Sequence, residues 1–319
     1  MTKPTLLQRL PLGQQADSLA RLEQDFEVIQ LWQADNQDAA LAACKDRVVA
    51  VVTGPSTPTP AEFIDKLPCL KAICSFGVGY EHVAVAYAHK KDIQVSNTPD
   101  VLNDCVADLT WGLILTTARH ISHADRYVRA GQWGHGPRLP LATKVSGKKL
   151  GILGLGRIGR EIAERARGFK MDVRYHGRHA HQDAGWPYEP SLLELARWAD
   201  FLVVAALGGP TTHHLVNRAI IEALGPKGVL INISRGSVID ETALVHALEN
   251  GELGGAGLDV FEAEPKVPDS LKQLDNVVLL PHIGSATVET RWAMVDLVLR
   301  NAQAFAKTGR VLTPIELQT

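Results

Sequence analysis

The sequence predicts an α/β protein built from two parallel-sheet domains, Rossmann-like and flavodoxin-like in type, with a cleft between them. Three observations lead to this prediction. Short runs of apolar and β-branched residues alternate with longer helix-compatible stretches, and this alternation starts twice along the chain. The 319 residues also exceed the roughly 100–200 residues of one domain. The predicted domains are 1–102 plus 288–319 and 103–287.

Four runs predict the strands of the first domain, and two stretches between them predict crossover helices. Parallel strands require such crossovers, because strands that run in the same direction cannot be joined by a tight turn. The strands are expected at 26–32, 47–54, 70–79 and 93–98, and the helices at 35–46 and 59–68.

Six further runs predict the strands of the second domain. A mostly apolar helix at 105–131 and an irregular Gly- and Pro-rich arm precede them, and an amphipathic helix at 287–309 that should end at Gly309 follows them. The strands are expected at 148–156, 171–177, 200–207, 228–234, 255–261 and 276–282.

The composition indicates a small-molecule partner. Thirty-three Lys and Arg against 35 Asp and Glu leave a net charge of −2 without a basic block, so binding to nucleic acid or membranes is not indicated. The first residues lack the apolar core of a signal peptide, and no stretch approaches the roughly 20 apolar residues of a membrane span, so we expect a cytoplasmic protein. The four cysteines form neither CxxC pairs nor a cluster with histidine, so we expect reduced thiols and no metal site.

A glycine pattern follows the first strand of the second domain. Gly154, Gly156 and Gly159 form G-x-G-x-x-G between the apolar run "KLGIL" and the helix-forming "REIAERAR", which is the strand-turn-helix context that a dinucleotide-binding loop requires. The glycines permit a tight turn, close approach of backbone N–H groups to a pyrophosphate, and close packing of helix and strand. The predicted cofactor contacts of this loop also include Leu155, Arg157 and Ile158.

The end of the next strand predicts which dinucleotide binds. An acidic residue that bonds an adenosine ribose belongs at the carboxyl end of that strand, whereas Asp172 stands at its beginning. The strand ends instead in Gly177, Arg178 and His179, and Arg178 offers a permanent charge and a fork of donors suited to phosphate. The sequence therefore favours NADP over NAD. The alternative is that Arg178 is a solvated loop arginine.

Three polar residues stand at the ends of later strands: Arg235, Glu264 and His282. Hydride transfer to a 2-keto acid needs a cation for the carboxylate and carbonyl, a proton donor near the carbonyl oxygen, and a group that holds that donor charged. Taken singly, each residue has a structural alternative. Arg235 could form an ion pair, Glu264 could cap a turn, and His282 could be a hydrogen-bonded histidine of the core. Their joint position in a dinucleotide-binding domain favours a catalytic site.

Longer segments resemble the D-isomer-specific 2-hydroxyacid dehydrogenase family. The likeness rests on "GLGRIGR", "INISRGSVIDETALVHALENGELGGAGLDVFEAEP" and "NVVLLPHIGSAT". The segment "SNTPDVLNDCVADLTWGLIL", together with the Gly-Arg-His that ends the second strand, is similar to the glyoxylate/hydroxypyruvate reductase branch. The resemblance covers the chain from about Val48 to Thr313.

The resemblance implies roles for individual residues. Arg235 would hold the substrate carboxylate and carbonyl, His282 would be the acid in reduction, and Glu264 would orient and charge that histidine. The backbone N–H groups of Val78 and Gly79 would bind the carboxylate together with Arg235. Further cofactor contacts are implied for Ile233, Ser234, Asp259 and Gly284, of which Asp259 would meet the nicotinamide carboxamide.

Two more cofactor contacts are implied, at Thr212 and Thr110. The family loop after the fourth strand commonly reads Pro-Leu-Thr-Pro-Glu-Thr, where this chain has "ALGGPTTHHLV", so a cofactor contact of Thr212 competes with a structural turn cap. Thr110 lies on the helix that enters the second domain, at a position near the cofactor in some relatives.

The resemblance implies an NADPH-dependent reductase of glyoxylate and hydroxypyruvate that forms (R)-2-hydroxy acids. The domain at 103–287 would bind the dinucleotide, and the domain at 1–102 plus 288–319 the substrate. Two alternatives stay open, a reductase of aromatic keto acids such as hydroxyphenylpyruvate and a dinucleotide-sensing binding protein. The segment at about 119–147 resembles the family's dimerisation arm, and its apolar residues, Trp133 and Leu139 among them, would be poorly buried in a monomer, so we expect a homodimer.

Overall fold

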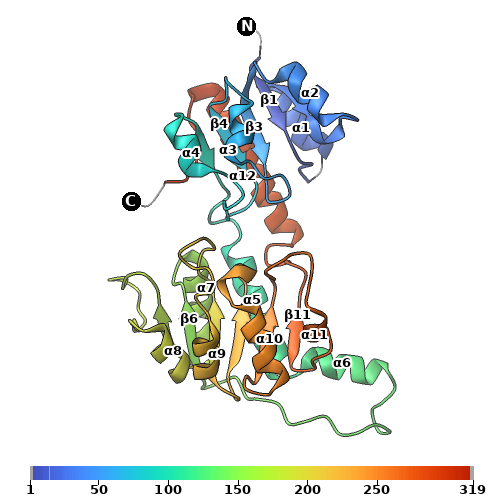
Figure 1. The fold of residues 1–319 in the computed structure, drawn as a ribbon, viewed down its shortest axis with the longest axis vertical. Helices are drawn as coiled ribbons and strands as arrows, with labels where there is room; N and C mark the ends of the chain where they lie inside the picture. The colour runs from blue at the N-terminus through green and yellow to red at the C-terminus, as the bar shows by residue number, and fades with distance from the viewer. Residues whose placement is uncertain (1–2, 14, 317–319) are drawn as a thin grey trace. The chain divides into compact units, whose positions relative to one another are not determined.

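The computed structural model of the chain describes residues 3–13 and 15–316. The chain divides into two compact units, each built on a parallel β-sheet, as Figure 1 shows. One unit comprises Met1–Leu102 and Ala286–Thr319, and the other comprises Asn103–Ser285. The predicted fold class, two parallel-sheet α/β domains, is confirmed. No helix in the described part of the chain is long and apolar enough to span a membrane.

The first sheet has the strand order β2-β1-β3-β4-β5, and all its neighbouring strands are parallel. Its inner strand β1, which lies between β2 and β3, was not predicted, because four residues show no period that separates a strand from other structures. All four side chains of β1 are buried, since the strand has a neighbour on each side and helices cover both faces of the sheet. The strands are β1 (Thr5–Gln8), β2 (Glu27–Gln30), β3 (Val48–Thr53), β4 (Ala72–Ser75) and β5 (Gln94–Ser96).

Helices cover both faces of this sheet, because successive side chains of a strand point to opposite faces. Leu7 packs in a core with α2 (Gln37–Cys44), α3 (Ala61–Asp65) and α4 (Val85–Lys90), whereas its neighbour Leu6 packs with α1 (Gln15–Glu23) and α12 (Val288–Thr308). The predicted C-terminal helix is confirmed in α12, and Gly309 ends it with φ 72°.

The second sheet has the strand order β11-β10-β9-β8-β6-β7, again all parallel. Each of its six strands falls within a predicted run. The inner strands stand out because they are mostly apolar, whereas the edge strand β7 alternates, with Val173 and Tyr175 buried. The strands are β6 (Lys149–Leu153), β7 (Asp172–His176), β8 (Phe201–Val204), β9 (Val229–Asn232), β10 (Gly255–Leu258) and β11 (Val277–Leu279).

The helices of the second unit form two groups. One core cluster packs α8 (Leu192–Trp198), α9 (Arg218–Leu224), α10 (Glu241–Glu249) and α11 (Asp269–Lys272) against the sheet. The helices α5 (Asn103–Ala118) and α7 (Arg157–Ala166) pack against each other, and α5 also contacts β9, β10 and β11.

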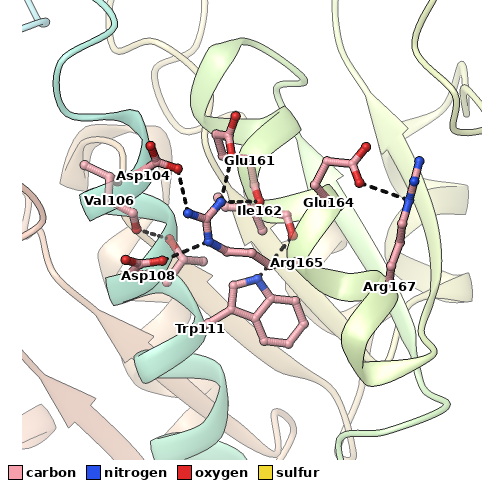
Figure 2. Close-up of polar contacts among 10 residues, drawn as sticks. Asp104, Val106, Asp108, Trp111, Glu161, Ile162, Glu164, Arg165 and Arg167 are labelled. Atoms are coloured by element: carbon pink, nitrogen blue, oxygen red, sulfur yellow. Dashed lines mark hydrogen bonds and ion pairs between the residues drawn. The ribbon is translucent and has the colours of Figure 1, made fainter.

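Figure 2 shows the polar contacts that hold α7 on α5. Arg165 of α7 donates to Asp104 and Asp108 of α5 at 2.7 and 2.8 Å, and Trp111 Nε1 of α5 donates to the carbonyl oxygen of Ile162 at 3.1 Å. Burial acts to lower the pKa of Arg165, but the hydrogen bonds to the neighbouring carboxylates outweigh it, so the pKa lies above its ordinary value. These contacts fix the orientation of α7, whose first turn belongs to the glycine loop.

The single helix predicted at 105–131 is wrong, because the chain breaks at His120. This residue has φ 52°, so α5 ends before it and a separate helix, α6 (Ile121–Arg129), follows. The arm after α6 has no regular structure up to β6, as predicted. Trp133 is 78% and Leu141 100% exposed, whereas Leu139, which we expected to be exposed, is half-buried.

Candidate functional site

Three loops of the second unit leave adjacent strands at the same edge of the sheet. They follow β9, β10 and β11, which are neighbours in the strand order and parallel, so their carboxyl ends share one edge. Ligands of open α/β sheets bind at this edge. The three loops carry Arg235, Glu264 and His282.

His282 and Glu264 are directly bonded. His282 Nδ1 lies 2.8 Å from Glu264 Oε2, and Glu264 Oε1 accepts a hydrogen bond from the backbone N–H of Phe261 at 3.0 Å. Burial acts to raise the pKa of Glu264, but the hydrogen bonds from His282 and Phe261 and the positive charges of His282 and Arg235 outweigh it, so the pKa lies below its ordinary value. The ionised carboxylate of Glu264 therefore occupies Nδ1 of the imidazole, and Nε2 is the nitrogen that can face a substrate.

Asp259 holds the backbone on which His282 stands. Its carboxylate accepts the backbone N–H groups of Ile283 at 2.7 Å and Gly284 at 2.8 Å, and its carbonyl oxygen accepts the N–H of His282 at 2.9 Å. His282 has φ 54°, a conformation that side chains with a Cβ adopt only when the surroundings impose it. Burial raises the pKa of Asp259, and the two N–H donors partly offset this. Asp259 therefore sets the direction in which the imidazole leaves the chain.

Arg235 lies near Glu264 because the loop after β9 closely approaches the loop after β10. The side chain of Asn232 accepts from Ser234 N–H at 3.0 Å and donates to the carbonyl oxygen of Arg235 at 3.0 Å, which closes the turn after β9. A Cβ on Gly236 would lie 1.9 Å from the carbonyl carbon of Phe261, so only glycine lets this turn meet the loop that carries Glu264. Neither Asn232 nor Gly236 was predicted as a site residue, although the glycine after Arg235 was a visible signal.

The glycine loop between β6 and α7 has room for a phosphate group. A Cβ on Gly154 would lie 2.7 Å from Ala206 N, and one on Gly159 would lie 2.2 Å from Gly154 O, so these two glycines permit close packing. Within the described part of the chain, a Cβ on Gly156 would meet no atom within 4 Å, and no side chain caps the first turn of α7 there. Backbone N–H groups at an uncapped helix N-terminus bind anions, so this loop fits the pyrophosphate of a dinucleotide. Leu155 is buried, and its contribution to such a site is its backbone.

The end of β7 is arranged as its sequence predicts. Asp172 is the first residue of the strand, and Arg178 and His179 follow its carboxyl end with exposed side chains. A Cβ on Gly177 would have its nearest neighbour at 4.0 Å, so the approach to this turn is open.

The two threonines with implied cofactor contacts are bonded to their own segments. Thr110 is fully buried and its hydroxyl donates to the carbonyl oxygen of Val106, one turn earlier in α5. Thr212 donates to the carbonyl oxygen of Leu207 at 2.7 Å and so closes its own loop. The structure therefore uses both hydroxyls locally. Ile233 and Ser234 are buried directly after β9.

The first unit carries the loop with Val78 and Gly79, directly after β4. Asn97 Nδ2 donates to Val78 O at 2.8 Å, and Thr98 both accepts from Gly77 N–H and donates to Gly77 O, so the loop is held from one side. Among residues 3–13 and 15–316, neither Val78 N–H nor Gly79 N–H has a hydrogen-bond acceptor in this structure. Two adjacent N–H groups in a turn form a small anion-binding cradle.

Comparison with known proteins identifies relatives along most of the chain. Residues 111–284 match the family described as D-isomer specific 2-hydroxyacid dehydrogenase, NAD binding domain. The chain is 49% identical to hydroxyphenylpyruvate reductase of Plectranthus scutellarioides, over 92% of this chain and 94% of that protein. It is 46% identical to glyoxylate/hydroxypyruvate reductase A of Arabidopsis thaliana, over the same shares of the two chains.

A solved structure is also similar. It is the NADPH-dependent glyoxylate/hydroxypyruvate reductase of Sinorhizobium meliloti in complex with NADP and malonate. It is 40% identical, covers 98% of this chain and 97% of its own, and superposes with a TM-score of 0.89.

Proposed function

Because the chain belongs to the D-isomer specific 2-hydroxyacid dehydrogenase family, we propose that it reduces small 2-keto acids, with glyoxylate and hydroxypyruvate as the leading substrates, to (R)-2-hydroxy acids with NADPH as the reductant. The observation that carries the proposal is the 2.8 Å contact between His282 Nδ1 and Glu264 Oε2, next to Arg235. Such a pair supplies a charged, oriented proton donor.

In this proposal each side chain has one task. When bound, the reduced nicotinamide supplies the hydride for C2 of the keto acid. His282 gives a proton from Nε2 to the carbonyl oxygen, while Glu264 stabilises the imidazolium through Nδ1. Arg235 binds the substrate carboxylate and polarises the carbonyl group, and the N–H groups of Val78 and Gly79 in the first unit bind a carboxylate oxygen.

The second unit is the dinucleotide-binding domain in this proposal. The loop Gly154–Gly159 takes the pyrophosphate, and Ile233, Ser234, Asp259 and Gly284 line the nicotinamide side. Thr110 and Thr212 contribute through the positions of α5 and of the loop after β8, since their hydroxyls have local acceptors. Gly177, Arg178 and His179 take the adenosine phosphate of NADP.

The preference for NADP rests on Arg178 and on the NADP complex of the similar Sinorhizobium protein. We expect Arg178→Ala to raise the KM for NADPH roughly 10- to 100-fold, the value of one lost charge-assisted contact, and to change the KM for NADH little. Arg197→Ala is a matched control, because Arg197 is an exposed arginine of α8 that pairs with Glu194. A wild-type enzyme that turns over NADH as well as NADPH would remove the role of Arg178.

A second candidate substrate class is aromatic keto acids. It is favoured by the 49% identity to a protein named hydroxyphenylpyruvate reductase. Oxidation of NADPH with glyoxylate, hydroxypyruvate, pyruvate and hydroxyphenylpyruvate as substrates separates the two classes by kcat/KM. The highest value with hydroxyphenylpyruvate would replace the first proposal by the second, and no turnover with any keto acid would favour a dinucleotide-sensing protein.

We also propose that the arm, residues 119–147, joins two copies of the chain. Trp133 and Leu141, in the part of the arm after α6, expose large apolar side chains, and such surface is costly in water unless a partner covers it. Sedimentation of the wild type as a dimer, and of Trp133→Ser as a weaker dimer or monomer, is the expected result. A monomeric wild type at micromolar concentration would refute it.

A further inference from the structure

A second cluster of titratable side chains lies in the same unit as the proposed active site. His213 and His214 lie in the loop after β8, and Glu262 follows β10, two residues before Glu264. His214 Nε2 lies 2.8 Å and His213 Nε2 3.9 Å from the same oxygen, Glu262 Oε1. One ligand atom from each of the three residues lies within 4.8 Å of those from the other two. The proposed reaction uses none of these residues.

The donor set suits a transition metal. Two imidazole nitrogens and one carboxylate oxygen are ligands that zinc takes in proteins, with a further position left for water. Bond lengths of about 2.0–2.1 Å place the ligand atoms of a tetrahedral zinc site about 3.3 Å apart. The separations of 2.8 and 3.9 Å lie on either side of this value, and the side chains are between 35% and 56% exposed, so small rotations suffice to reach it.

The backbone already directs two of the ligands toward each other. His214 has φ 49°, and its N–H donates to the carbonyl oxygen of Ser237 at 2.8 Å, which holds it in that unusual conformation. Glu262 N–H donates to Glu241 Oε2 at 3.1 Å. Ligands on anchored backbone lose less conformational freedom when a metal binds.

A further carboxyl group lies beside the cluster, since Glu241 Oε2 accepts the Glu262 N–H at 3.1 Å. The negative charge of a neighbouring carboxylate favours binding of a cation. We expected no metal site, because the cysteines form neither CxxC pairs nor a cluster with histidine. His214 and Glu262 lie 48 positions apart, so no local motif indicates their contact.

We propose that His213, His214 and Glu262 form a binding site for a divalent first-row transition metal of the zinc type. The bound ion would tie the loop after β8 to the loop that carries Glu264. This site is independent of the proposed reaction, since its test needs neither substrate nor dinucleotide.

The test measures zinc binding to the full-length protein without an affinity tag, after treatment with a chelator and its removal. Titration calorimetry with Zn²⁺ should show one site per chain. His213→Ala and Glu262→Gln should each lower the affinity at least 10-fold, as loss of a ligand does. His246→Ala is the matched control, because His246 is also an exposed histidine beside a glutamate, Glu252, at 3.6 Å, and should bind zinc as the wild type does.

A second measurement guards against variants that fold poorly. Zn²⁺ should raise the Tm of the wild type and of His246→Ala but not that of His213→Ala, whose metal-free Tm is the reference. Equal zinc affinity in the wild type and His213→Ala would overturn the proposal. So would the absence of stoichiometric binding, or loss of the site in His282→Ala with retention in His213→Ala, since the ion would then sit on the His282–Glu264 pair.

Discussion

Two histidine–glutamate pairs share one loop of the second unit and differ in what surrounds them. Glu262 binds His214 Nε2 and Glu264 binds His282 Nδ1, both at 2.8 Å, and both histidines have positive φ angles. The two pairs are similarly exposed to solvent. The side chains of His214 and Glu262 are each 35% exposed, and those of His282 and Glu264 are 47% and 36% exposed.

The neighbours separate the pairs. The His282 pair has the buried Asp259 under its backbone and the charge of Arg235 beside Glu264, whereas the His214 pair has a second histidine stacked at 3.9 Å and Glu241 nearby. A cation close to the pair suits binding of an anionic substrate, and a second imidazole suits binding of a metal. In the two proposals, the third group beside each pair therefore decides its chemistry.

Replacement of His282 tests this contrast most strongly. We expect His282→Ala to lower kcat by roughly 10²- to 10⁴-fold, about 3–5 kcal/mol of transition-state stabilisation, because the proton donor is lost. His214→Ala should have a much smaller effect in metal-free buffer. NADPH oxidation with hydroxypyruvate measures both. Equal losses in the two variants would show that the pairs are not functionally distinct.

The close approach at Gly236 is the next largest expected effect. Gly236→Ala forces a Cβ into the backbone of Phe261, and such overpacking costs about 1–3 kcal/mol or more. We expect a lower Tm and a raised KM for the keto acid, since Arg235 moves away from Glu264. Gly112→Ala is the control, because a Cβ there meets no atom within 4 Å. An unchanged KM in Gly236→Ala would mean that Arg235 does not depend on this contact.

Asp259→Asn tests the support of His282. An amide can accept only one of the two N–H groups that the carboxylate accepts now, and one buried donor left without an acceptor costs about 1–3 kcal/mol. Denaturant unfolding should show this loss, and kcat should fall while the KM for NADPH changes less. If kcat keeps its wild-type value, the position of the imidazole does not depend on Asp259.

The smallest expected effects are in the pH dependence of the unfolding free energy, and they have opposite signs for Glu264 and Asp259. The pKa of Glu264 is lowered, so its stabilising contribution is fully present above the ordinary value of 4.5 and is lost as the pH falls through the lowered pKa. The pKa of Asp259 is raised, so its contribution is fully present below 3.8 and is lost as the pH rises through the raised pKa.

Unfolding free energies of Glu264→Gln and Asp259→Asn as a function of pH check these signs. The destabilisation caused by Glu264→Gln should shrink in acid, and that caused by Asp259→Asn should shrink toward neutral pH. The same direction in both variants would contradict the opposed environments of the two groups.

The fold was predictable where patterns are long. The six strands of the second sheet, the C-terminal helix and its stop at Gly309 are visible in the sequence, because strands of parallel sheets are rich in apolar residues and an αL stop favours glycine. The four-residue β1 and the break at His120 were missed. In the first case the run is too short to show a period, and in the second a residue other than glycine or proline ends the helix.

The sequence by itself determined that the chain has two parallel sheets, that a glycine loop opens α7, and that Arg235, Glu264 and His282 follow strands, because each of these is a local pattern. Only the tertiary structure decided which side chains meet. The Asp259 carboxylate under Ile283 and Gly284, the approach of Gly236 to Phe261, and the meeting of His214 with Glu262 join segments 24, 25 or 48 positions apart. Such contacts depend on the order of the strands in the sheet, and that order cannot be predicted from any single segment of the sequence.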